Sequence, residues 1–265
     1  MERLGKIIVF LLLAASPLFG QWDIGQRPHY RAGGVIMTLA QSPMAPFNTA
    51  QTTYSVSITA GGMVPTTAGN IGILLVALAA ADTAATNPYT SGAVADSAGD
   101  TFTHCGSAWP QTVLNTGDSQ YEVVDCFWYP SLTGGATSVT LTVNWEAHYA
   151  TPYVDLQFLE ASKSSGTWSF AGGATAAALP SGTSLSAAPI TGLAAGNYYC
   201  TTWETSAHLK PVSIAPAWAS PITIDNTNAY AAFAGVLDLS TWTTPTWTLS
   251  ATEAYEQMTA SACWQ

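Results

Sequence analysis

The acidic side chains of this chain could do acid/base chemistry if two of them met in one cleft. A glycosidase needs two carboxyl groups about 5–10 Å apart, one as acid and one as base or nucleophile. Asp155 and Glu160 lie an odd number of positions apart in an alternating segment, so they face opposite sides of a strand. These two acids therefore cannot pair directly. The acids considered for such a pair are Glu146, Asp155, Glu160 and Glu204.

Glu146 and His148 remain as weak catalytic candidates. One residue separates them just beyond Trp145, so their side chains can share a face. A solvated strand end is the simpler interpretation of the same residues. The sequence has no G-x-S-x-G elbow of a serine hydrolase, and its four histidines lack the close spacing of a zinc site. We therefore expect a protein that is not an enzyme, with catalysis kept as the alternative.

The ten tryptophans are the most suggestive feature of the sequence, because aromatic faces stack on sugar rings. Several lie in strand-like segments, where they would fill the core. Trp109, Trp218 and Trp242 lie instead in segments rich in Pro, Ala, Ser and Thr, which are typical of loops. We expect these loop tryptophans to bind a sugar or polymer. The alternative is ordinary packing against the ends of the fold.

The composition excludes some classes of partner. Only 8% of the residues are charged and 48% are apolar, which argues against a disordered chain. The formal charge of −10 reflects a scarcity of Lys and Arg rather than acidic runs. Nucleic-acid binding needs a basic surface that this composition cannot supply.

The N-terminal residues predict export. Residues 1–20 combine Arg3 and Lys6, an apolar run and a Pro-Gly break, which is the pattern of a signal peptide. The alternative is an uncut anchor, although the apolar run is shorter than the ~20 residues of a membrane helix. Residues 21–34 indicate a linker or extended arm. The mature chain is predicted to lack a membrane span and to be secreted or held at the cell surface.

Four cysteines follow the signal segment, and an even number in an exported chain favours disulfides. Cys105 and Cys126 lie in successive strand-like segments. Cys200 and Cys263 lie in segments that could be neighbours in a β fold. We therefore favour these two pairings among the alternatives. A zinc site is disfavoured because no C-x-x-C spacing occurs.

Alternation of apolar and polar residues dominates the remaining chain and predicts strands. We expect one antiparallel, all-β domain at residues 35–265, built as a jelly-roll-like sandwich of two sheets. Residues 172–196, rich in Ala, Ser and Gly, are either a long surface connection or an internal boundary. The expected strands are residues 35–41, 54–59, 71–80, 101–105, 120–129, 137–145, 153–158, 197–205, 229–239, 246–249 and 255–264.

One hairpin motif carries a resemblance. Residues 94–102 read Val-Ala-Asp-Ser-Ala-Gly-Asp-Thr-Phe, similar to a recurring Asp-Ser-x-Gly-Asn-x-aromatic hairpin. Together with residues 37–42, 54–58 and 67–77, the motif resembles uncharacterised secreted bacterial proteins with jelly-roll or lectin-like sandwich domains. The group usually has Asn where this chain has Asp100. The resemblance implies a fold and no activity.

Asp96 and Asp100 are explained by a turn, since Asp96 can accept bonds from nearby amides and Gly99 can adopt positive φ. They are also weak candidates for a calcium site, and calcium is the one cofactor that the sequence leaves open. The favoured function is a secreted, non-catalytic binding or structural module with a polysaccharide or cell-surface glycan as partner. The alternatives are a lectin-fold glycoside hydrolase or lyase, and a self-associating coat or fibre subunit.

Overall fold

A computed structural model of the chain describes residues 37–41, 44–47, 55–81, 89–107, 109–115, 120–145, 152–179, 181–194, 196–205, 211–215, 218, 222–224, 231–252 and 257–265. The expected signal segment, the arm, Glu146 and His148 lie outside these residues. Every element of regular secondary structure in these residues is a β-strand, and the strand pairings are antiparallel. The predicted all-β, antiparallel class is confirmed. Nowhere in these ranges is there a helix long and apolar enough to cross a membrane.

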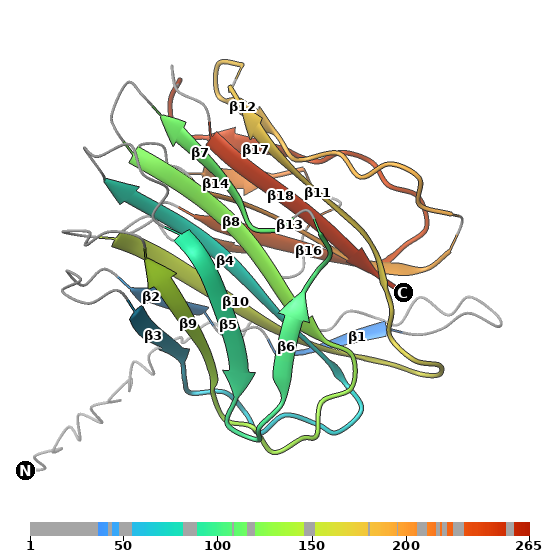
Figure 1. Cartoon of the computed structure of the whole chain (residues 1–265). Coiled ribbons are helices and arrows are strands. Elements are labelled where there is room, and N and C mark those ends of the chain that lie inside the picture. The colour runs from blue at the N-terminus through green and yellow to red at the C-terminus, as the bar shows by residue number, and fades with distance from the viewer. Residues whose placement is uncertain are drawn as a thin grey trace, which may run out of the picture. The chain divides into compact units, whose positions relative to one another are not determined.

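The largest sheet has ten strands and is strongly curled (Figure 1). Its main path is β1-β10-β4-β8-β6-β5-β9-β3, with β2 beside β10 and β7 beside β8. The strands are β1 (Met37–Gln41), β2 (Met44–Phe47), β3 (Ser55–Ala60), β4 (Ile71–Ala81), β5 (Tyr89–Asp96), β6 (Thr101–His104), β7 (Gln111–Asn115), β8 (Gln120–Tyr129), β9 (Val139–Trp145) and β10 (Pro152–Lys163).

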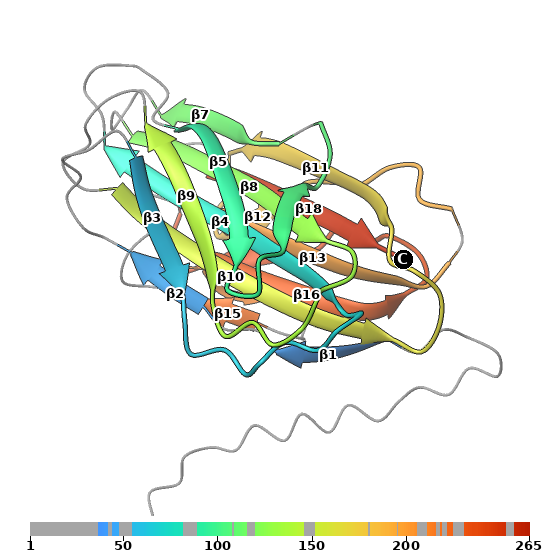
Figure 2. The ribbon, with the colours of Figure 1, turned by 60° about the horizontal axis from the view of Figure 1, so that its bottom comes forward.

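The curl encloses one hydrophobic core. Alternate residues of β4 and β10, including Leu74, Val76 and Phe158, meet residues of β3, β5 and β9 such as Ile58 and Leu141. Figure 2 shows β3, β9 and β5 in front of β4, β8 and β10. The opposite faces of β4, β8 and β10 are buried as well, by a second core. This two-sided burial explains why β4 is a continuous apolar run rather than an alternating one.

A five-stranded sheet covers that second face, in the order β11-β18-β13-β16-β15. Ile73 and Val124 of the curled sheet pack there against Phe233 and Ala260 of the five-stranded sheet. Trp203 also crosses the layer, because its Nε1 donates a hydrogen bond to the Val76 carbonyl at 3.1 Å. The strands are β11 (Phe170–Ala178), β13 (Tyr198–Thr205), β15 (Ile222–Ile224), β16 (Ala232–Leu239) and β18 (Gln257–Trp264).

A small sheet of three strands forms the outermost layer, in the order β12-β17-β14. Its strands are β12 (Ser184–Ser186), β14 (Pro211–Ile214) and β17 (Thr246–Leu249). Trp247 and Leu249 of β17 join Ala232 and Ala234 of β16 in a third core. The described strands therefore form three sheets, and the expected arrangement of two is not confirmed.

The segment expected to be a connection or boundary, residues 172–196, contains most of β11 and all of β12. Its small residues hide the strand signal, but close packing explains them. A Cβ on Gly173 would lie 3.1 Å from the Phe170 ring and 3.2 Å from the Ser261 carbonyl oxygen. Small side chains thus let β11 lie close against its surroundings.

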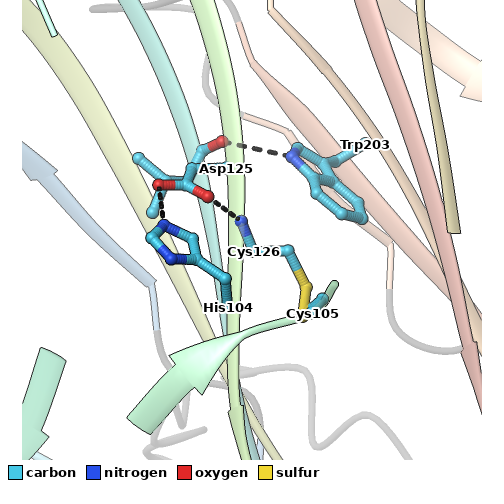
Figure 3. The surroundings of a disulfide bond; sticks show 6 residues. His104, Cys105, Asp125, Cys126 and Trp203 are labelled. Atoms are coloured by element: carbon cyan, nitrogen blue, oxygen red, sulfur yellow. Dashed lines mark hydrogen bonds and ion pairs between the residues drawn. A yellow bond between two sulfur atoms is a disulfide. The ribbon is translucent and has the colours of Figure 1, made fainter. Parts of the chain in front are cut away.

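The structure contains both expected disulfides. Cys200 and Cys263 are directly opposite each other in β13 and β18, with Cα atoms 4.1 Å apart. Cys105, which follows β6, is bonded to Cys126 of β8, and its amide also donates to the Cys126 carbonyl at 2.9 Å (Figure 3). The first bridge therefore joins two neighbouring strands of the five-stranded sheet, and the second fixes the chain where it leaves β6.

Gly72 gives a direct test of the packing inside the curl. A Cβ at this position would lie 2.9 Å from both Leu132 Cδ2 and the Phe102 ring. We expect Gly72→Ala to lower the free energy of unfolding by about 1–3 kcal/mol, because these buried groups must shift. Gly61→Ala is the matched control, since no atom lies within 4 Å of its Cβ position, and it should change stability by less than about 0.5 kcal/mol. Equal effects in urea denaturation would contradict this packing.

Candidate functional site

Two of the three loop tryptophans are core residues in the structure. Trp109 is 7% exposed and stacks on Trp203, with ring centroids 5.1 Å apart. Trp218 is 1% exposed and makes an edge contact with Trp242 at 5.2 Å. Both rings are buried, so neither offers an open face to a sugar. Packing against the ends of the fold, the alternative interpretation, describes where these two rings lie.

Trp242 is different, because it is only half-buried and lines a pocket of about 360 Å³. The pocket lies where the chain leaves β16, opposite the segment that approaches β13. Ile190 and Leu193 supply apolar lining, and Ser240 and Thr241 supply hydroxyl groups. Trp242 Nε1 donates to Thr244 Oγ1 at 3.3 Å, and the buried Trp218 supports the ring.

This lining suits a neutral, polar ligand with apolar faces. An indole ring and two aliphatic side chains can contact the C–H face of a sugar, while the hydroxyls and the exposed backbone can bond its hydroxyl groups. No charged side chain is among the described residues that line the pocket. The volume falls within the range of about 300–1,000 Å³ of small-ligand sites. Trp242 is thus a sequence-predicted binding residue that lines a pocket.

Asp96 and Asp100 form the turn that the motif predicts. Asp96 Oδ1 accepts bonds from the Ala98 and Asp100 amides, both at 2.9 Å, and Gly99 has φ of 94°. The carboxylate of Asp100 accepts both the amide and the hydroxyl of Thr133 at 2.7 Å. Asp96 thus closes the β5–β6 turn, and Asp100 ties this turn to the loop that contains Thr133. In the described ranges, no three His, Cys, Asp or Glu residues gather as metal ligands would.

Those acids considered for catalysis that the structure describes have buried side chains. Asp155 is fully buried on β10, on the side of Leu159, whereas Glu160 lies on the opposite side of the strand. Glu160 accepts hydrogen bonds from the Thr67 amide at 2.8 Å and from Asn70 Nδ2 at 2.6 Å. Glu160 therefore anchors the loop before β4.

Glu204 is the most unusual acid in the described part of the chain. Its side chain is fully buried on β13, and neither carboxylate oxygen has a hydrogen-bond partner. Burial, and to a lesser degree the charge of Glu122, raises the pKa of Glu204 well above its usual value. A neutral carboxylic acid is the form that fits such a position.

Sequence reasoning missed the pair of His104 and Asp125. His104 Nε2 lies 3.2 Å from Asp125 Oδ2, beside the Cys105–Cys126 bridge (Figure 3). The imidazole packs on the Phe127 ring, with ring centroids 4.2 Å apart. Asp125 is fully buried and also accepts the Cys126 amide at 2.7 Å. A carboxylate that orients an imidazole supplies two of the three groups of a hydrolytic triad. No hydroxyl or thiol of the described residues bonds His104, so the pair lacks a nucleophile there.

Neither the models of known protein families nor the curated proteins match this chain. The chemistry of its own residues is therefore the basis for assigning a function. Among the described residues, the Trp242 pocket combines an accessible aromatic ring with free space. The buried acids and the His104–Asp125 pair do not.

The raised pKa of Glu204 predicts a specific dependence of stability on pH. The folded protein keeps the Glu204 proton at pH values where the unfolded chain, with a pKa near 4.5, has lost it. The contribution of Glu204 to the free energy of unfolding therefore falls as pH rises above about 4.5. We expect Glu204→Gln to be more stable than the parent at pH 8 by at least about 1 kcal/mol, and this gain to shrink toward pH 4.

Glu160→Gln is the matched control for this substitution. Glu160 accepts several protein hydrogen bonds, and an amide nitrogen in place of one oxygen would face their donors. The same chemical change should therefore destabilise the protein at neutral pH. Urea denaturation at a series of pH values measures both variants. A Glu204→Gln variant that is less stable than the parent at pH 8 would show that the buried carboxyl is satisfied.

Proposed function

We propose that this protein is a secreted, non-catalytic binding module that holds carbohydrate in the Trp242 pocket. The observation that carries the proposal is the half-buried indole of Trp242 lining a pocket with Ser240 and Thr241. Stacking on the ring supplies affinity, and hydroxyl contacts at the rim orient the sugar. An uncharged lining matches an uncharged ligand.

The setting of the pocket supports recognition rather than chemistry. Trp218 packs against Trp242 from the third core, so the ring is held before a ligand arrives. A ring that is already in place loses little conformational entropy on binding. The described residues of the pocket lining include no Asp, Glu or His that could transfer a proton.

Disulfides and layering support the extracellular part of the proposal. Two disulfides are compatible with an oxidising compartment. We infer that the curled sheet and the five-stranded sheet together are an elaborated, jelly-roll-like sandwich, since their facing sides share one core. Lectin-like folds of this kind present ligand sites at loops and strand ends.

Self-association is the second candidate, favoured by β3. This strand is last in the path of the curled sheet, so one backbone edge has no paired strand among the described residues. The outward hydroxyls of Ser57 and Thr59 bond those of Thr142 and Thr140 on β9, at 3.1 and 2.8 Å. An uncharged edge of this kind can pair with a second copy. Concentration-dependent growth in light scattering would support it.

Binding to a glycan panel tests the carbohydrate proposal. We expect the purified protein to bind a subset of neutral glycans, and Trp242→Ala to weaken that binding about tenfold, or about 1.4 kcal/mol, with little change in melting temperature. Thr243→Ala is the control, because Thr243 is exposed beside Trp242 and does not line the pocket. Trp218→Ala is unsuitable, since removing this buried ring should cost about 3–5 kcal/mol of stability.

The glycan-panel experiment also separates a binding module from an enzyme when its products are assayed. New reducing ends or unsaturated sugars in the presence of the protein would assign a glycoside hydrolase or lyase instead of a binding module. Glycan binding that is equal in Trp242→Ala and the parent protein would refute the pocket as the site.

A further inference from the structure

A second and larger pocket, of about 560 Å³, lies at the same end of the five-stranded sheet. It forms between the turn after β10, the start of β13 and the end of β18. Its polar lining comes from Lys163, Ser165, Thr167, Ser169, Asn197 and Gln265. Among the described lining residues, Lys163 carries the one charged side chain. The pocket therefore places a cation beside several hydrogen-bonding groups.

Lys163 is the single Lys or Arg of the described residues. Its ammonium group lies 4.9 Å from the centroid of the Trp168 ring and donates to the Thr167 carbonyl. No carboxylate of the described residues lies within ion-pair distance of Lys163. The one ion-pair contact among these residues joins His104 and Asp125. Partial burial lowers the pKa of Lys163, so a bound anion would favour its charged form.

The two pockets flank one short connection. Ala194 lines the Trp242 pocket and Gly196 lines the Lys163 pocket. Residues two positions apart are separated by at most about 7 Å between Cα atoms. Tyr198 fixes this connection, because its hydroxyl donates to the Ala194 carbonyl at 2.7 Å. A ligand of two or three sugar rings is long enough to reach from one pocket to the other.

We propose that the Lys163 pocket is an anion subsite that takes the carboxylate of an acidic sugar, in a chain whose neighbouring sugar lies on Trp242. The inference rests on the proposed carbohydrate function and extends it to oligosaccharides in which one uronic acid adjoins the neutral sugar that lies on Trp242. The ammonium group of Lys163 pairs with the carboxylate. Ser165, Thr167 and Asn197 supply polar atoms for the ring hydroxyls.

The net charge of −10 opposes this ligand only at long range. At physiological ionic strength, charges more than about 8 Å apart are largely screened. Among the described lining residues, Lys163 has the one charged side chain near a carboxylate inside the pocket. The distant acids would slow its approach without removing the local preference.

The test compares a trisaccharide that has one terminal uronic acid with its methyl ester, which keeps the sugar rings and removes the negative charge. Calorimetric titration should show that the parent protein binds the acid about tenfold more tightly than the ester. Lys163→Met should remove this preference and leave ester binding unchanged. Lys163→Arg should retain the preference, because it keeps the charge. Raising the salt concentration should reduce the preference in the parent protein.

Equal binding of acid and ester by the parent, or a preference that survives in Lys163→Met, would overturn the subsite. Trp242→Ala separates this failure from that of the carbohydrate proposal. Ester binding that depends on Trp242, with no preference for the acid, keeps the Trp242 site and refutes the Lys163 subsite. Acid binding that needs Lys163 but not Trp242 refutes the joint site and leaves an isolated anion pocket. Melting curves of all variants verify that they are folded.

Discussion

Burial of β4, β8 and β10 on both faces is the constraint on which the rest of this structure depends. Side chains of one parity point into the curl of the ten-stranded sheet, and those of the other parity point into the layer shared with the five-stranded sheet. A single sheet covers only one face of such strands. The curl supplies one cover and the five-stranded sheet supplies the other, and the small sheet then buries the outer face of β13, β16 and β18.

This layering determines which polar groups the interior tolerates. Trp203 bonds the Val76 carbonyl, and Thr202 Oγ1 donates to the Ala260 carbonyl at 2.8 Å. Glu160 holds the loop before β4 through several donors. These groups are paired, as buried polar groups must be. Not every buried group is paired: among the described residues, Glu204, Tyr199 Oη and Trp264 Nε1 have no hydrogen-bond partner. Burial raises the pKa of Glu204, which favours its neutral form.

The two pockets lie instead at one end of the five-stranded sheet. The Trp242 pocket and the Lys163 pocket are built from turns and strand ends, where backbone groups and side chains reach solvent. The sheets behind them hold these turns in place, partly through the paired backbone bonds of Ser169 and Gln265 at 2.8 and 3.0 Å. A rigid layered core with ligand contacts at its rim is how many β proteins separate stability from binding.

Local patterns in the sequence were sufficient for much of the fold. The expected segments 120–129 and 246–249 coincide with β8 and β17, and both disulfides and the Asp96 turn are present. Each depends on alternation, on turn chemistry or on cysteines in neighbouring strands, which nearby residues specify. β11 was missed because Gly and Ala carry no alternation signal, although close packing requires them.

The curl, the burial of Trp109 and Trp218, and the two pockets were decided only by tertiary structure. A loop tryptophan and a core tryptophan look alike in sequence, because the difference lies in which distant strand the loop covers. Lys163 and Asn197 line one pocket through the pairing and packing of strands far apart in the chain. Sequence thus determined which segments are strands and which cysteines pair, whereas long-range packing determined which side chains remain accessible to a ligand.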